Sequence, residues 1–149
     1  FNAPHQPAQA PEQLLEKYRK RGFFGRKLGQ AGAIEAMDVA IGRVLNTIEE
    51  EDMAEETLVM FFCDNGSGGF GRRGYNVLPG QLALRGGKGT VLEGGIRVPA
   101  VLRWPGVIPP GTKYNQLISA QDLFPTFSAA AGIKPANQSP ARGSTPRSW

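Results

Sequence analysis

The spacing of apolar residues predicts two helices in the first third of the chain. Pro11 is expected to begin a short helix over residues 12–18, whose first turn is acidic and whose last turn is basic, as the helix dipole favours. A longer helix is expected from about Gln30 to Glu51, because its apolar residues recur with a period of about 3.6. These apolar residues are Ile34, Met37, Ile41, Val44, Leu45 and Ile48.

Short apolar runs predict strands in the middle of the chain. Residues 57–63 are almost continuously apolar, which is typical of a parallel strand covered on both faces. Residues 98–104 predict a second strand and residues 116–119 a third, shorter one. Between the first two strands, residues 64–96 form a long Gly-rich loop with little periodicity. A loop of this length inside a compact domain is usually functional or disordered.

The last predicted helix begins after Ser119, which fits an N-cap, and ends at Gly132. The remaining residues, 134–149, are rich in Pro, Ser and Arg and predict a flexible tail. Strand, loop and helix alternate before this tail. The pattern therefore predicts a layered α/β domain with a mostly parallel sheet.

Composition narrows the class of protein. The 149 residues allow one domain or part of one, and 20 glycines and 12 prolines favour a loop-rich α/β protein over a helical bundle. No apolar run approaches the roughly 18 residues of a membrane-spanning helix. The first residues lack the pattern of a signal peptide, and we interpret them as the interior of a domain.

The charge of the chain leaves two interpretations open. The formal net charge is +4, and the basic residues are spread along the sequence, which favours an ordinary solvated surface. The alternative is a non-enzymatic basic module that binds nucleic acid or a sulfated polymer. The single cysteine, Cys63, excludes an internal disulfide and leaves the cellular compartment open.

Asp64 and Asn65 are candidate metal ligands. They come directly after the first predicted strand, and ligands collect at the carboxyl ends of strands in open α/β sheets. A carboxylate beside a carboxamide supplies hard oxygen donors, which suit Ca²⁺ or Mg²⁺ better than zinc. The alternative is a plain Asx turn, because Asp-Asn-Gly is a common turn sequence.

Lys88 and His5 are candidate anion-binding residues. Glycines on both sides of Lys88 would let the backbone approach a ligand closely, and its ammonium would act as a point charge for a sulfate or phosphate oxygen. The imidazole of His5 could donate a proton to a leaving oxygen. A surface role is the alternative for both. Glu93 and Arg97 are four residues apart and predict structural support, either by pairing with each other or by bracing the lysine loop.

In order and spacing, the motifs of residues 1–133 resemble the later part of the catalytic domain of the sulfatases. The sequences that carry the resemblance are Asn2-Ala3-Pro4-His5-Gln6-Pro7, Ala36-Met37-Asp38, Asp64-Asn65-Gly66, Arg85-Gly86-Gly87-Lys88-Gly89-Thr90, Glu93-Gly94-Gly95-Ile96-Arg97-Val98-Pro99, Arg103-Trp104-Pro105-Gly106 and Asp122-Leu123-Phe124-Pro125-Thr126.

The resemblance implies part of an alkaline-phosphatase-like α/β/α sandwich that hydrolyses sulfuric esters. Asp64 and Asn65 would bind a metal ion, usually Ca²⁺ with Mg²⁺ possible, and His5 and Lys88 would contact the sulfate ester as substrate-binding and catalytic residues. Neither nucleic acid nor a membrane is expected as a partner. Relatives are often secreted, periplasmic or lysosomal, and the sequence does not choose among these compartments.

The sequence also departs from the family pattern. The sulfatase nucleophile is a formylglycine made from Cys or Ser in a Cys/Ser-x-Pro-x-Arg motif, and Cys63 is followed instead by Asp64-Asn65-Gly66-Ser67. The paired N-terminal aspartates of the metal site are also missing. We therefore expect this chain alone to be inactive and to need the missing N-terminal half of the domain. A phosphatase or phosphodiesterase of the same superfamily is the alternative, although one histidine is few for its usual two zinc ions.

Overall fold

The computed structural model describes residues 1–66 and 84–133. It divides the chain into two compact units, Phe1–Thr57 and Leu58–Trp149. The predicted tail, residues 134–149, and residues 67–83 of the Gly-rich loop lie outside the described residues. No helix in the described part of the chain combines the length and the apolarity needed to span a membrane.

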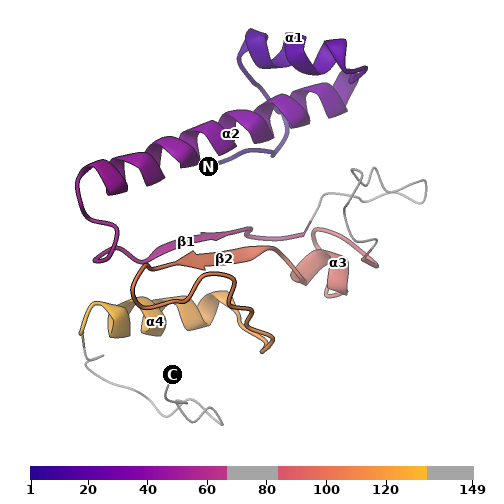
Figure 1. Cartoon of the computed structure of the whole chain (residues 1–149). Helices are drawn as coiled ribbons and strands as arrows, with labels where there is room; N and C mark the ends of the chain where they lie inside the picture. The colour runs from indigo at the N-terminus through magenta and orange to yellow at the C-terminus, as the bar shows by residue number, and fades with distance from the viewer. Residues whose placement is uncertain (67–83, 134–149) are drawn as a thin grey trace. The chain divides into compact units, whose positions relative to one another are not determined.

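The first unit contains a helical hairpin of α1 (Glu12–Lys20) and α2 (Gly25–Glu50), shown in Figure 1. The prediction that Pro11 begins α1 is confirmed: its carbonyl oxygen accepts hydrogen bonds from the amides of Leu14 and Leu15, at 2.9 and 3.1 Å. Gly22 ends α1 with a φ of +82°, and the Phe23 amide donates to the Tyr18 carbonyl at 3.0 Å. Glycine is favoured here because this left-handed conformation strains other residues.

The start of α2 differs from the prediction. The helix begins at Gly25, five residues before the predicted start at about Gln30. Gly29 serves packing: a Cβ atom at this position would lie 2.7 Å from the Ala8 carbonyl oxygen. One turn later, a Cβ on Gly32 would lie 2.8 Å from the Ala10 Cβ. These glycines therefore let the preceding chain approach α2 closely, and Ala31 and Ala33 are buried beside them.

A polar cluster also joins the two helices. The Lys17 ammonium on α1 lies 2.5 Å from the Glu35 carboxylate on α2. The hydrogen bond from Lys17 and a second one from Tyr18 lower the pKa of Glu35. The hydrogen bond between Tyr18 and the Glu35 carboxylate in turn raises the pKa of Tyr18. The Phe23 ring packs edge-on against Tyr18, with the ring centroids 5.3 Å apart. This cluster fixes the register of the hairpin.

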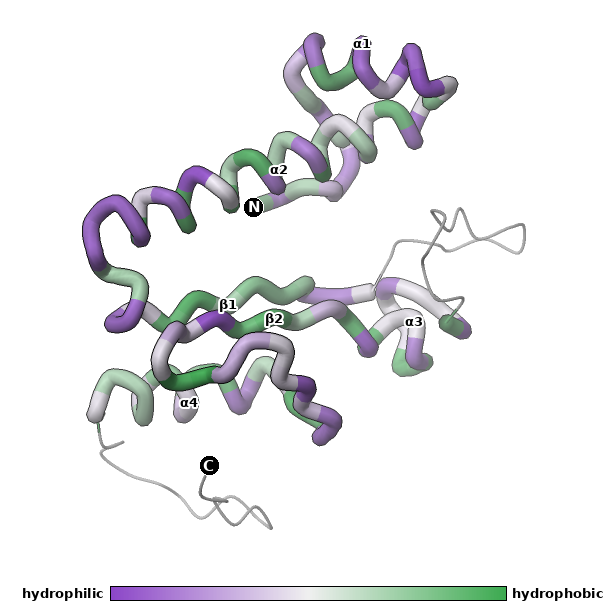
Figure 2. Tube along the Cα trace, in the orientation of Figure 1, coloured by the Kyte–Doolittle hydropathy of each residue, from purple (hydrophilic) through white to green (hydrophobic). Residues whose placement is uncertain are grey.

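The second unit contains a two-stranded sheet of β1 (Val59–Phe62) and β2 (Ala100–Arg103). The prediction of an α/β protein is confirmed, but that of a mostly parallel sheet is not, because the described strands pair antiparallel, with Val59 opposite Arg103. The apolar run reflects the hydrophobicity of β1, visible in Figure 2, and carries no information on strand direction. The long connection between the two strands permits either direction.

Two further predictions for this unit were wrong. Residues 116–119 form no strand, and Leu117 is 98% exposed. Within the Gly-rich loop, Glu93–Ile96 form a short helix, α3, that the low periodicity did not reveal. The prediction for the last helix is confirmed: Ser119 caps the short helix η1 (Ala120–Asp122), which leads into α4 (Leu123–Ala130).

Both ends of this last helical segment are closed by local hydrogen bonds. Asp122 Oδ2 accepts a hydrogen bond from the Ser119 amide at 2.7 Å, and Ser119 Oγ accepts one from the Gln121 amide at 3.3 Å. At the other end, Gly132 has a φ of +69°, and the Ile133 amide donates to the Ser128 carbonyl at 2.8 Å. The sequence signals for both ends are therefore confirmed.

Candidate functional site

The end of β1 carries the candidate metal ligands. The Cys63 amide donates to the Pro99 carbonyl at 3.2 Å, which extends the strand pairing by one residue. Asp64 follows and is exposed, while Asn65 is half-buried. The Asn65 side-chain amide donates to the Gly66 carbonyl at 3.0 Å. This bond uses one of the amide N–H groups of Asn65 and does not involve its side-chain oxygen.

Directly after this strand, the chain meets two segments that lie about 20 to 30 residues later and are neighbours of each other in sequence. The Gly66 amide donates to the Gly95 carbonyl at 2.9 Å, and the Gly94 amide donates to the Arg85 carbonyl at 2.7 Å. These bonds join the Asp64-Asn65-Gly66 turn, the lysine loop (residues 85–90) and α3. We call this meeting point of Gly66, Gly94 and Gly95 with the lysine loop the glycine junction.

The glycine junction has no room for side chains. A Cβ atom on Gly66 would lie 1.8 Å from the Gly94 carbonyl oxygen, and one on Gly95 would lie 2.2 Å from the Thr90 carbonyl oxygen. A Cβ on Gly94 would lie 2.5 Å from the Gly86 carbonyl oxygen. Gly66 and Gly95 are buried. The glycines are therefore needed because backbone packs directly on backbone.

Thr90 closes the lysine loop around Lys88. Its amide and its hydroxyl both donate to the Gly87 carbonyl, at 3.0 and 2.8 Å, and its hydroxyl accepts a hydrogen bond from the Gly87 amide at 3.2 Å. Lys88 lies at the turn of this closed loop and is half-buried, and its ammonium makes no hydrogen bond or ion pair with another described residue. Sequence reasoning overlooked Thr90, although a threonine shortly after a Gly-rich turn is a signal for such a closure.

Glu93 and Arg97 pair with each other. Arg97 Nη1 lies 3.2 Å from Glu93 Oε2, across one turn of α3, and both side chains are exposed. This arrangement is one of the two that the sequence left open. An exposed pair of this kind contributes little to stability by itself.

His5 belongs to the first unit, whereas Asp64, Asn65 and Lys88 belong to the second. The imidazole is exposed, and its Nδ1–H donates to the Gln6 carbonyl at 2.8 Å. This bond leaves Nε2 as the atom that can meet a ligand. The structure thus brings the turn of Asp64 and Asn65 and the loop of Lys88 together in one unit. The approach of His5 to them stays a prediction.

The donor set near β1 suits a hard cation only in part. Within residues 1–66 and 84–133, no group of three or more His, Cys, Asp or Glu side chains is arranged to hold a metal ion. Asp64 and Asn65 offer oxygen donors, which fit Ca²⁺ by chemistry, and further ligands would have to come from elsewhere. Cys63 is half-buried in the strand extension, as expected of a packing residue rather than of a nucleophile.

Comparison with known proteins gives a consistent answer. The family model described as Sulfatase matches residues 1–133. Mouse steryl-sulfatase is 42% identical over 117 residues, which cover 76% of this chain and 19% of that protein. Human arylsulfatase A is 39% identical over 130 residues, which cover 86% of this chain and 23% of that protein. The chain therefore spans about a fifth of the length of these curated relatives.

A solved structure also matches. The crystal structure of Ps i-CgsB in complex with k-i-k-neocarrahexaose superimposes with a TM-score of 0.75 and 31% sequence identity. The match covers 91% of this chain and 28% of that chain. The similarity of fold therefore extends over both units.

Proposed function

This chain belongs to the sulfatase family, and we propose that it forms part of a sulfuric ester hydrolase catalytic domain that binds a divalent cation and a sulfate ester. The observation that carries the proposal is the glycine junction. Its two backbone hydrogen bonds hold the turn of Asp64 and Asn65 beside the loop of Lys88. The turn would supply oxygen donors for a metal ion, and the loop would supply the Lys88 ammonium for a sulfate oxygen. The backbone hydrogen bonds connect these two segments.

Asp64 and Asn65 would hold the cation, which we propose to be Ca²⁺, with Mg²⁺ as the alternative. When bound, such an ion supplies positive charge that stabilises a sulfate group and the nucleophile beside it. The chain's own contribution would be to restrain the donors: the hydrogen bond from the Asn65 side-chain amide to the Gly66 carbonyl limits the rotation of the carboxamide, and Asp64 is exposed.

Lys88 and His5 would act on the sulfate ester. The bonds between Thr90 and Gly87 restrain the backbone on both sides of Lys88, and its ammonium would stabilise the sulfate oxygens where negative charge develops as the ester bond breaks. The Nδ1–H of His5 is held by the Gln6 carbonyl, so the protonated ring presents Nε2–H. This proton is suited to the leaving oxygen of the alcohol. Glu93 and Arg97 would support the loop from α3.

We propose that these 149 residues by themselves do not turn over sulfate esters. The sequence contains no Cys/Ser-x-Pro-x-Arg motif from which the family's formylglycine could form. The test is hydrolysis of an aryl sulfate by the purified chain, with a complete sulfatase as the positive control. Turnover at a rate like that of the complete enzyme would refute this part of the proposal.

Cation binding is tested by calorimetric titration of the full chain with CaCl₂. Asp64→Asn should weaken binding strongly because it removes the one charged donor of the turn. Asp38→Asn is the matched control, since Asp38 is an exposed carboxylate on α2. Equal affinities of the two variants would contradict the assignment. Stoichiometric zinc in the purified chain would favour a phosphatase or phosphodiesterase of the same superfamily instead.

Anion binding is tested with inorganic sulfate in the presence of CaCl₂. Lys88→Ala should lower the affinity for sulfate, because the ammonium is the ligand group of the closed loop. Lys113→Ala is the control, since Lys113 is an exposed lysine of the same unit. If both variants bind sulfate as the unmodified chain does, Lys88 is an ordinary surface lysine.

A further inference from the structure

The helical hairpin carries a dense basic segment that the sulfate site does not use. Residues 17–27, which span the end of α1, the connection and the first turn of α2, contain no acidic residue. We call this segment the basic turn. Its six cationic residues are Lys17, Arg19, Lys20, Arg21, Arg26 and Lys27.

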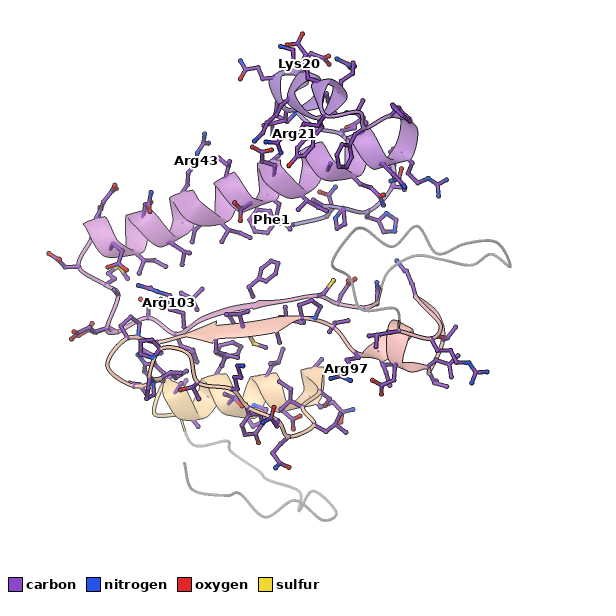
Figure 3. All side chains as sticks on the ribbon, turned by 45° about the vertical axis from the view of Figure 1, so that its right-hand side comes forward. Phe1, Lys20, Arg21, Arg43, Arg97 and Arg103 are labelled. Carbon is purple, nitrogen blue, oxygen red and sulfur yellow. The ribbon has the colours of Figure 1, made fainter. Side chains whose placement is uncertain are left out.

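Only two of these six cations form an ion pair with a carboxylate in the part of the chain that the structure describes. Lys17 pairs with Glu35, and Arg19 pairs with Glu12 at 3.2 Å. Among the described residues, no carboxylate forms an ion pair with the other four, which are all exposed: Lys20, Arg21, Arg26 and Lys27. Figure 3 labels Lys20 and Arg21 at the end of α1. The basic turn therefore keeps an excess of positive charge on its surface.

Local structure accounts for only part of these charges. Lys20 and Arg21 lie at the carboxyl end of α1, where the helix dipole favours cations, but Arg26 and Lys27 have no such explanation. The first turn of α2 contains Arg26 and Lys27 and no acidic residue, although the positive end of a helix dipole favours acidic ones. The N-cap residue, Phe24, provides no side-chain hydrogen bond to the helix amides. Cations at this place weaken the helix slightly, and a bound polyanion would offset that repulsion.

The aromatic residues of the basic turn distinguish between classes of polyanion. Tyr18 and Phe23 pack on each other, and the Arg21 guanidinium lies 5.7 Å from the centre of the Tyr18 ring, so neither ring is free to stack on a ligand. Phe24 is 78% exposed and lies in sequence between the pair Lys20 and Arg21 and the pair Arg26 and Lys27. Single-stranded nucleic acid is bound by successive aromatic platforms. One exposed ring among cations fits an anionic sugar polymer better.

We propose that the basic turn binds a sulfated polysaccharide chain through residues that the proposed sulfate site does not include. The sulfate groups would lie on Lys20, Arg21, Arg26 and Lys27, and the apolar face of one sugar ring would lie on Phe24. The choice of a sulfated polymer among polyanions rests on the proposed function, whereas the choice of a polyanion rests on the charges alone.

The experiment measures binding of the full chain to heparin oligosaccharides at several salt concentrations. The double variant Arg26→Gln/Lys27→Gln is compared with Arg43→Gln/Lys113→Gln, which removes the same charge from exposed residues outside the basic turn. The slope of log affinity against log salt should fall by about 1.4 in the first variant, at about 0.7 per lost contact, and stay unchanged in the second. Phe24→Ala should lower the affinity and leave the slope unchanged.

Several outcomes would overturn the proposal. An equal loss of heparin affinity in the two double variants would show that binding depends on the net charge of the chain and not on the basic turn. Tighter binding of a single-stranded DNA with the same number of charges would assign the surface to nucleic acid. Lys88→Ala should leave heparin binding intact; if it abolishes binding, the polymer occupies the sulfate site. If Lys88→Ala binds inorganic sulfate as the unmodified chain does, while the basic-turn variants change heparin binding as expected, the proposed function is contradicted and the basic turn is not. Far-UV circular dichroism of each variant checks that α1 and α2 are retained.

Discussion

Replacement of Gly66 by alanine tests the glycine junction most directly. The new Cβ would lie 1.8 Å from the Gly94 carbonyl oxygen, whereas nonbonded atoms need about 3.5 Å, so the two backbones would have to separate by about 1.7 Å. That separation would break the hydrogen bond from the Gly66 amide to the Gly95 carbonyl. One such bond contributes about 0.5–1.5 kcal/mol. Overpacking adds about 1–3 kcal/mol.

The expected loss for Gly66→Ala is therefore on the order of 1.5–4.5 kcal/mol, a large part of the stability of an ordinary domain. Urea unfolding of the full chain, followed by the fluorescence of the half-buried Trp104 in the same unit, measures it. Gly106→Ala is the matched control. Gly106 has a φ of +79° and open space around its Cβ position, so alanine there costs only the backbone strain of roughly 1–2 kcal/mol.

The comparison separates crowding from backbone strain. If Gly66→Ala destabilises the chain no more than Gly106→Ala does, the two backbones are not in contact in solution. The glycine junction would then be wrong, and with it the argument that Asp64 and Lys88 are held together. A loss of calcium binding by Gly66→Ala in the absence of urea would in addition show that the glycine junction is needed for cation binding.

Two further predictions concern the hairpin and the last helical segment. Because hydrogen bonds from Lys17 and then Tyr18 lower the pKa of Glu35, the stabilisation is present above the unfolded-state value of about 4.3 and is lost as the pH falls through the lower folded-state pKa. Thermal melts at acid pH should show this loss, and Glu35→Gln should reduce the dependence; an unchanged dependence would refute it. Ser119→Ala should destabilise α4 by about 1 kcal/mol in urea unfolding. Asp122→Ala should add little to it, and full additivity would mean that the capping box does not form in solution.

Local sequence determined the features that depend on a few neighbouring residues. Ser119 and Asp122 cap their own helix, Gly132 ends it, and Pro11 begins α1, because each of these arrangements is completed by hydrogen bonds within one turn. The resemblance to the sulfatases over residues 1–133 also came from sequence alone, through the order of short motifs, and the family comparison confirmed it.

Tertiary structure decided what depends on contacts between distant segments. The direction of β1 relative to β2 could not be read from apolar runs, since such runs give the hydrophobicity of a strand and not its direction. The run did not give burial either, because Phe61 and Phe62 are exposed in the described structure. The early start of α2 follows from Gly29 packing against Ala8, a contact between segments that no local pattern encodes.

The candidate site shows the same division. The sequence identified Asp64, Asn65 and Lys88 by residue type and by their place after strands and glycines. Only the tertiary structure showed that Gly66 packs on Gly94, which holds the two motifs in one unit. The physical reason is that residue type determines what chemistry a side chain can supply. Its position relative to another motif is determined by backbone contacts between segments far apart in the chain.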